Sequence, residues 1–315
     1  MILFAACKKD KTHAPEAETP PITQPTSNTA NIEAIINNLG TPLETFTMNV
    51  ANGTYYTCNN GTHILINPNS FMTPGYELVT GIVTITVKDI LSKKDMILNN
   101  AFPVSNGNLL VSGGQLYFSA KQGNNSLRPN PDSPVYVSVP TVGTPSGDMK
   151  LFVASSPSNL SQTNLNWMPN NSNILLSAST PGTPANEYGY DLSFSDSIHW
   201  TNCDHFYNAP VAKTTCTVLT SGVANSTNTI AFISMNGQRI LARLYPNTST
   251  LYSFASYSNS IPIGSNYTIG VICYDGTNYY YGSQQMTMTA DMIIQLPPLT
   301  QATRSEVLAN LSALQ

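Results

Sequence analysis

Residues 188–195 have the sequence Tyr-Gly-Tyr-Asp-Leu-Ser-Phe-Ser, in which large apolar side chains alternate with small or polar ones. This period of two is typical of a half-buried β-strand, because successive side chains of a strand point to opposite faces. Residues 81–87, Gly-Ile-Val-Thr-Ile-Thr-Val, have the same period in the first half of the chain. Both halves are therefore predicted to consist of strands.

Turn signals divide the rest of the chain into short segments of the same kind. Apolar and β-branched runs recur about every ten residues, which is the spacing of a sandwich or a barrel. Residues suited to tight turns separate these runs at Asn59-Asn60-Gly61, Asn106-Gly107, Gly113-Gly114, Asn236-Gly237 and Asp275-Gly276. The sequence predicts an all-β fold with two β-sandwich domains, residues 45–140 and 186–297, and a connector with edge strands over residues 141–185.

Three segments have helix signals instead. Residues 31–39 are followed by Gly40 and Pro42, which end a helix. Residues 92–95, Ser-Lys-Lys-Asp, have the form of a capping box and predict one helical turn. A second capping box begins at Thr303 and predicts a C-terminal helix over residues 303–314, packed on the second sandwich through an apolar stripe.

The composition narrows the possible functions. Charged residues make up 10% of the 315 residues, well below the ~25% of a typical soluble domain. The net charge is -4, and the 13 Lys and Arg are scattered along the chain. A nucleic-acid partner is not expected, because there is no basic stripe to bind a phosphate backbone.

The start of the chain predicts a lipid anchor. Residues 3–7, Leu-Phe-Ala-Ala-Cys, resemble the lipobox of bacterial lipoproteins, in which the signal peptidase cuts before the cysteine and a diacylglycerol thioether on this cysteine holds the protein to the membrane. This resemblance implies that residues 1–7 are the end of an export signal and that Cys7 carries the membrane anchor. Residues 8–30 are rich in Pro, Thr, Ser and charged residues, which predicts a disordered tether. The expected location is the bacterial outer membrane, on either its periplasmic or its surface face.

The first sandwich resembles a known family. Residues 52–54 (Asn-Gly-Thr), 64–71 (Ile-Leu-Ile-Asn-Pro-Asn-Ser-Phe) and 79–85 (Val-Thr-Gly-Ile-Val-Thr-Ile) are similar to a ZU5-type β-sandwich module of the kind found in bacterial envelope lipoproteins. The resemblance covers residues 45–140 and implies contact with a protein partner. It does not imply the self-cleavage of some members, which requires a His-Phe-Ser triplet; residues 205–207 are His-Phe-Tyr and lie outside the matched region.

Export would also determine whether the cysteines can form disulfides. An oxidising compartment permits disulfides, and the short separation of Cys203 and Cys216 predicts a bridge between adjacent strands. Cys58 lies far away in the sequence and is expected to be a buried small hydrophobe.

Residues 199–207, His-Trp-Thr-Asn-Cys-Asp-His-Phe-Tyr, are the densest group of potentially reactive side chains. Cys203 and His205 are candidate metal ligands or a candidate nucleophile–base pair. Two ligands do not complete a zinc site, and no third group is specified to orient a catalytic base. We therefore expect a structural segment with Trp200 in the core, and keep an enzyme or metal site here as the alternative.

The tyrosines suggest a second alternative. Tyr279, Tyr280 and Tyr281 are consecutive, so at least one ring points to each face of a strand. An exposed ring of this group could stack on a sugar and form a carbohydrate platform. The main prediction from the sequence is a non-enzymatic envelope lipoprotein without a cofactor, which binds a protein or a glycan.

Overall fold

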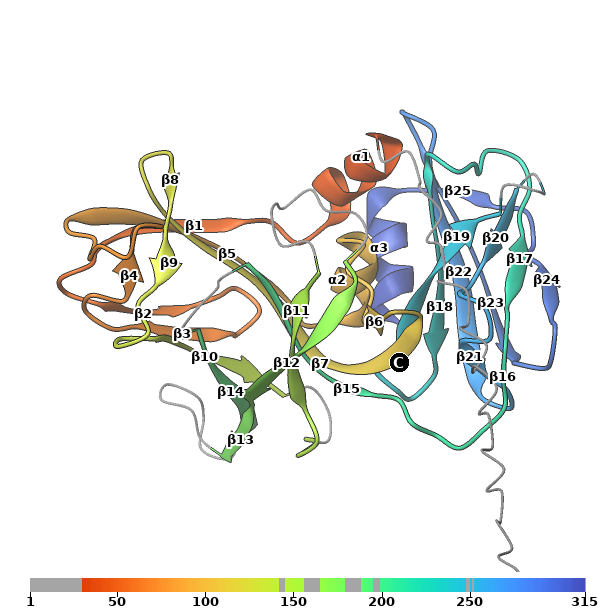
Figure 1. Ribbon diagram of the computed structural model, residues 1–315. Coiled ribbons are helices and arrows are strands. Elements are labelled where there is room, and N and C mark those ends of the chain that lie inside the picture. The colour runs from red at the N-terminus through yellow and green to blue at the C-terminus, as the bar shows by residue number, and fades with distance from the viewer. Residues whose placement is uncertain are drawn as a thin grey trace, which may run out of the picture.

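The computed structural model describes residues 30–141, 145–155, 165–178, 188–194, 199–247, 250 and 252–314. The predicted anchor Cys7 and most of the tether lie outside these residues. The described chain consists mainly of strands, with three helices and several sheets, so the predicted all-β class with a C-terminal helix is confirmed. Figure 1 shows two strand-rich halves with the helices between them.

The first half is a pair of antiparallel sheets. The larger sheet has the order β1 (Glu44–Asn49), β5 (Ile82–Ile90), β7 (Asn108–Gln122), β15 (Trp200–Phe206), β11 (Lys150–Ala154) and β12 (Trp167–Asn173). The facing sheet has the order β13 (Leu175–Ala178), β14 (Tyr188–Phe194), β10 (Val135–Pro140), β3 (His63–Ile66) and β2 (Thr54–Thr57). Side chains of both sheets meet in one apolar core, which includes Ile85 and Phe118 from the first and Ile64 and Val137 from the second. This is the arrangement of a β-sandwich.

This sandwich also contains several short strands. Two of them, β6 (Val104–Ser105) and β8 (Asn125–Ser126), pair with the ends of β7. Two others, β4 (Phe71–Met72) and β9 (Arg128–Pro129), pair with each other.

The structure moves the predicted boundary between the domains. β14 and β15 were expected in the second sandwich, yet β14 pairs with β10 and β15 pairs with β7 and β11. The predicted connector supplies β11, β12 and β13 to the same sandwich. Alternation within a strand fixes which of its faces is buried but not which strand lies beside it, so the sequence pattern could not place this boundary.

The second half is one path of eight strands. Its order is β24 (Ile293–Gln295), β17 (Thr217–Leu219), β20 (Ser253–Ala255), β19 (Leu241–Pro246), β18 (Thr229–Met235), β22 (Asn266–Tyr274), β23 (Tyr279–Thr287) and β25 (Thr300–Ala302). All neighbours are antiparallel except β17 and β24. A separate small pair is formed by β16 (Lys213–Thr214) and β21 (Ile261–Pro262). The predicted hairpin turns at Asn236-Gly237 and Asp275-Gly276 are confirmed by the β18–β19 and β22–β23 pairings.

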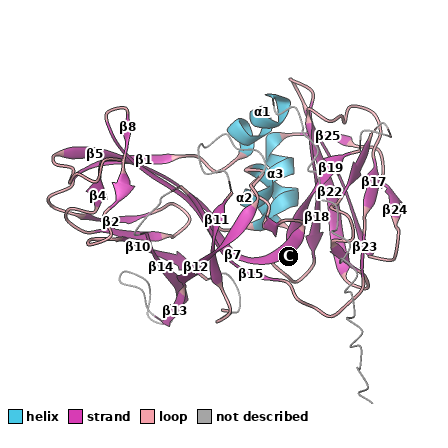
Figure 2. Ribbon diagram, viewed as in Figure 1, coloured by secondary structure: helices cyan, strands magenta, loops and turns pink. Residues whose placement is uncertain are grey.

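Three helices lie between the two halves, as Figure 2 shows: α1 (Ala30–Leu39), α2 (Lys93–Leu98) and α3 (Arg304–Ser312). All three predicted helices are therefore confirmed. Their buried side chains, such as Ile35 of α1, Ile97 of α2 and Leu311 of α3, belong to one core cluster with β18 and β22. Trp200 of β15 belongs to that cluster too, which confirms its predicted burial and joins the first sandwich to the second half through the helices.

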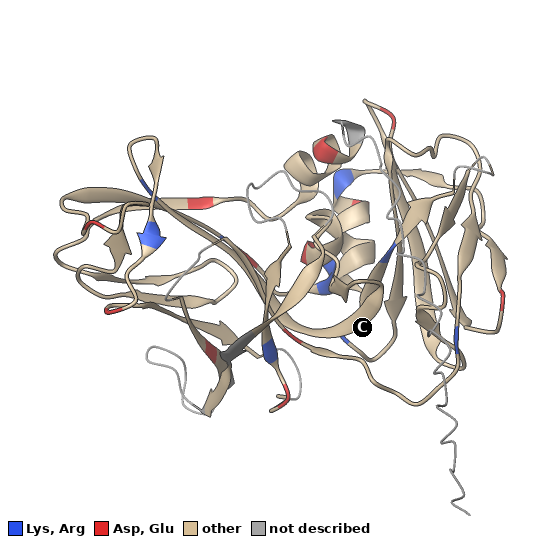
Figure 3. Cartoon of the chain, in the orientation of Figure 1, with Lys and Arg blue, Asp and Glu red and all other residues tan. Residues whose placement is uncertain are grey.

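The charged residues are few and scattered over both halves, as Figure 3 shows. Of the described helices, none has the length and apolar character that crossing a membrane requires.

Candidate ligand pocket

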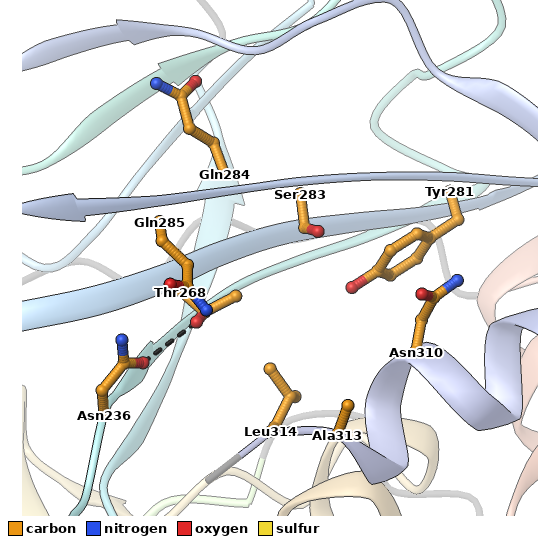
Figure 4. A pocket seen from close by; sticks show the side chains of 9 residues that line it. All are labelled: Asn236, Thr268, Tyr281, Ser283, Gln284, Gln285, Asn310, Ala313 and Leu314. Atoms are coloured by element: carbon orange, nitrogen blue, oxygen red, sulfur yellow. Dashed lines mark hydrogen bonds between the residues drawn. The ribbon is translucent and has the colours of Figure 1, made fainter.

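A cavity of about 420 Å³ lies between β22, β23 and α3. Figure 4 shows the nine side chains around it. They are Asn236, Thr268, Tyr281, Ser283, Gln284, Gln285, Asn310, Ala313 and Leu314. Seven of the nine are amides or hydroxyl-bearing side chains, and none is charged.

Strand alternation builds one wall of this pocket. Tyr281, Ser283 and Gln285 are spaced by two along β23 and therefore project from the same face. Figure 4 shows Gln284 pointing to the other side of the strand. Thr268 of β22 is paired with Gln285 in the antiparallel register, so its side chain lies beside Gln285 on this face.

The β18–β19 turn closes one end of the pocket. Asn236 begins this turn, and its side-chain Oδ1 accepts a hydrogen bond of 2.9 Å from the hydroxyl of Thr268. The amide nitrogen of Asn236 remains available on the same side chain as a donor for a ligand.

The opposite wall is formed by Asn310 of helix α3 and by Ala313 and Leu314, which directly follow the helix. The helix is held in place by Val307 and Leu311, which are buried in the core. Its first turn is fixed by the predicted capping box, in which Thr303 and Glu306 exchange backbone and side-chain hydrogen bonds.

The pocket offers a ligand neutral hydrogen-bonding groups. Burial raises the pKa of Tyr281, so its hydroxyl stays protonated and can donate at neutral pH, although the nearby Ser283 hydroxyl lowers this pKa in part. Amide side chains both donate and accept hydrogen bonds. This chemistry matches a ligand rich in hydroxyl groups better than an anion or a cation.

The three tyrosines do not form one exposed platform. Tyr279 is half-buried and its ring stacks on Tyr274 with centroids 4.8 Å apart. Tyr280 donates a hydrogen bond of 3.0 Å to Asp275. Tyr281 is buried on the face of β23 opposite to Tyr280 and borders the pocket. Only the last of the three is placed to meet a ligand in that pocket.

The structure separates the candidate residues of the segment 199–207. Cys203 is buried in the core of the first sandwich, and burial raises its pKa well above the usual value. His205 is half-buried, and its Nδ1 lies 3.1 Å from the carbonyl oxygen of the next residue, Phe206. His199 borders a different small cavity with Tyr117. Within the described ranges, neither Cys203 nor His205 belongs to a group of three residues able to hold a metal ion.

The structure does not bring Cys203 and Cys216 together. Both thiols are free, and they lie in different core clusters. The prediction assumed that their strands are neighbours. Cys203 lies on β15, which pairs with β7 and β11, whereas Cys216 immediately precedes β17, which pairs with β20 and β24.

Sequence reasoning did not find the pocket. The alternation of Tyr281, Ser283 and Gln285 is visible in the sequence, but the same pattern describes any half-exposed strand. What makes it a pocket is the wall from α3, about 25 to 30 residues later, which only the folded chain provides. The chain matches no family model, no curated protein and no solved structure. The resemblance of residues 45–140 to ZU5-type modules therefore stays a prediction.

Proposed function

We propose that this protein is a non-enzymatic binding protein of the bacterial envelope, anchored through lipid on Cys7, and that the pocket beside α3 binds a neutral glycan. The observation that carries the proposal is the set of uncharged amide and hydroxyl side chains that, apart from Gln284, face one cavity. Amide and hydroxyl groups both donate and accept hydrogen bonds, as the hydroxyl groups of a sugar do, so several of them can pair with one neutral glycan at once.

The size of the cavity favours a small ligand over a protein partner. Its volume of about 420 Å³ falls in the ~300–1,000 Å³ range of small-molecule sites. A protein partner generally covers a broad surface of ~800 Å² on each side. A single oligosaccharide end fits the cavity better than such an interface.

The lining residues also favour binding without hydrolysis. Most glycosidases cleave sugars with two carboxylates that flank the scissile bond. Among the described residues that line this pocket, none has a carboxylate side chain. A bound glycan would therefore be held and released unchanged.

The test uses the full chain and a panel of neutral and charged oligosaccharides, with binding measured by calorimetry. Gln285→Ala and Asn310→Ala each remove one amide from the pocket and should weaken the binding of a neutral glycan about threefold to tenfold, as expected for one hydrogen bond. Gln238→Ala is the matched control, since Gln238 is an exposed glutamine in the adjacent turn and does not line the pocket. Its affinity should equal that of the wild type.

Two results would contradict the glycan assignment. One is the absence of binding across the neutral panel. The other is binding that Gln238→Ala reduces as much as Gln285→Ala does. A third outcome is that the chain binds a protein partner and that the pocket variants bind this partner as well as the wild type does. That outcome would favour the protein contact that the ZU5-type resemblance implies.

The envelope anchor has a separate test. Cells that express the protein are labelled with an alkynyl fatty acid, which should tag the wild type but not Cys7→Ala. Equal labelling of the two proteins would refute the lipid anchor. The glycan pocket would still be tested separately by the calorimetric measurements.

A further inference from the structure

A second group of polar side chains lies at one end of the first sandwich. Glu44 begins β1, Cys58 directly follows β2, and Asp89 is the next-to-last residue of β5. One carboxylate oxygen of each acid and the sulfur of Cys58 all lie within 4.8 Å of one another. The three residues are only 8%, 3% and 0% exposed. Three potential ligand atoms thus converge in a site that excludes bulk water.

Neutral donors hold Glu44 in position. Its Oε2 accepts a hydrogen bond of 2.8 Å from the hydroxyl of Tyr56, and its Oε1 accepts one of 2.9 Å from the backbone N–H of Asn59. The Tyr56 ring is itself fixed by stacking on Phe46, with centroids 4.1 Å apart. Supporting contacts of this kind orient a metal ligand before the metal binds.

Asp89 is less well satisfied. Its Oδ2 accepts a hydrogen bond of 3.3 Å from the backbone N–H of Thr62, while its Oδ1 is buried without a hydrogen-bond partner. The hydroxyl oxygen of Thr62, which is 0% exposed, also lacks a partner of good geometry. A buried oxygen without a partner costs about 1–3 kcal/mol, and such groups in folded proteins call for a specific explanation such as a bound ion.

We propose that Glu44, Cys58 and Asp89 form a binding site for a divalent transition-metal cation, with Zn²⁺ as the best match. One sulfur and two carboxylate oxygens are ligands that zinc accepts, whereas calcium needs six to eight oxygens. Ligand atoms around a tetrahedral zinc are about 3.3–3.8 Å apart, given metal–ligand bonds of about 2.0–2.3 Å. Atoms that already lie within 4.8 Å of one another need their separations to shorten by at most about 1.0–1.5 Å.

The chemistry of binding is a proton exchange at the thiol. The S–H bond of Cys58 breaks, its electron pair forms the sulfur–metal bond, and the proton passes to solvent. Burial, together with the carboxylates of Asp89 and Glu44, raises the pKa of Cys58, so the thiol holds that proton until a cation displaces it. Two carboxylates and one thiolate carry three negative charges, which a divalent cation largely neutralises. The fourth position of zinc is left for water or for the Thr62 hydroxyl.

The experiment uses the full chain carrying Cys7→Ala, so that the four remaining cysteines are the buried ones. After treatment with a chelator, Zn²⁺ binding is measured by competition with a chromophoric indicator. One equivalent should bind. Asp89→Asn and Cys58→Ser should each weaken binding by about a hundredfold or more, because losing a ligand costs at least as much as losing the residue that orients one. Cys273→Ser and Asp191→Asn, which change the same residue types elsewhere, should bind like the parent.

Co²⁺ supplies a second readout that does not depend on affinity. The parent chain with Co²⁺ should show a thiolate-to-metal charge-transfer absorption, and Cys58→Ser should lack it while Cys273→Ser retains it. Asp89→Asn keeps the shape of the side chain, and far-UV circular dichroism shows whether each variant is folded. If Cys58→Ser is unfolded, Asp89→Asn and Glu44→Gln decide the question.

The proposal is overturned if the parent chain binds neither Zn²⁺ nor Co²⁺. It is equally overturned if folded Asp89→Asn and Glu44→Gln bind Zn²⁺ as tightly as the parent. Neither result bears on the glycan pocket, since that pocket is formed by β22, β23 and α3 in the second half.

Discussion

At the scale of single residues, Gly113 and Gly114 show how a turn signal can have another meaning. They were predicted to form a turn between two strands, but they lie inside the single 15-residue strand β7. The pairing of β7 with β15 shifts its register here, so the two glycines form a β-bulge. Close packing explains the residue type: a Cβ at Gly113 would lie 2.8 Å from the carbonyl oxygen of Cys203 and 2.9 Å from the ring of Tyr190.

Gly113→Ala should therefore lower the free energy of unfolding by about 1–3 kcal/mol, as overpacking of a core does. Gly147→Ala is the control, because a Cβ at Gly147 meets no atom within 4 Å. It should change the stability by less than about 0.5 kcal/mol. Urea denaturation of the two variants beside the wild type measures both effects, and equal midpoints for all three proteins would contradict the packing argument.

At the scale of elements, the capping box of α3 makes the stability of this helix, which forms one wall of the pocket, depend on pH. The carboxylate of Glu306 accepts hydrogen bonds from the backbone N–H and the hydroxyl of Thr303, at 2.7 and 2.8 Å. These bonds hold the pKa of Glu306 below its usual value. Protonation is therefore harder in the folded chain than in the unfolded chain. The resulting stability is present above the unfolded pKa of about 4.3 and is lost as the pH falls through the folded value.

Thermal unfolding between about pH 6 and pH 3 tests this linkage. The wild type should be more stable than Glu306→Gln at the upper end, and the difference should shrink as the pH falls below about 4.3. A constant difference across the range would show that the Glu306 carboxylate is not linked to folding. Glu33→Gln, on α1, is a control for the loss of one helix carboxylate.

At the scale of the whole molecule, polar contacts tie the two halves together in addition to the shared core. Arg239 lies in the β18–β19 turn, and its guanidinium donates to the backbone carbonyls of Ser112 and Leu91 in the first half. The backbone N–H of Ser112 donates back to the carbonyl of Arg239 at 3.0 Å. Lys93 of α2 donates to the carbonyl of Met235 at 2.8 Å. These bonds leave little room for the halves to move independently.

We therefore expect the two halves to unfold in one cooperative transition. Both tryptophans, Trp167 and Trp200, lie in the shared core, so their fluorescence reports on it while circular dichroism reports on all strands. The two signals should change together with denaturant. Arg239→Ala should lower the free energy of unfolding by about 2–4 kcal/mol, because two carbonyls lose their donors. Arg304→Ala removes only one solvent-exposed hydrogen bond, to the carbonyl oxygen of Asn38, and should lower the free energy of unfolding by clearly less. Two separated transitions in the wild type would contradict a single unit.

Local patterns in the sequence determined the elements. The three helices, the hairpins at Asn236-Gly237 and Asp275-Gly276, and the buried Trp200 follow from residues that are close in the chain. Capping, turn formation and side-chain alternation act over two to four residues, so they can be predicted without knowledge of the fold.

Only the tertiary structure decided how these elements combine. The pattern of Tyr188–Phe194 identified β14 as a strand, but its pairing with β10 depends on residues about 50 positions away. The same holds for the pocket beside α3 and for the cluster of Glu44, Cys58 and Asp89, whose members are individually unremarkable in the sequence. Alternation specifies which face of a strand is buried and says nothing about the identity of its neighbour. Contacts between distant segments therefore emerge only when the whole core is packed.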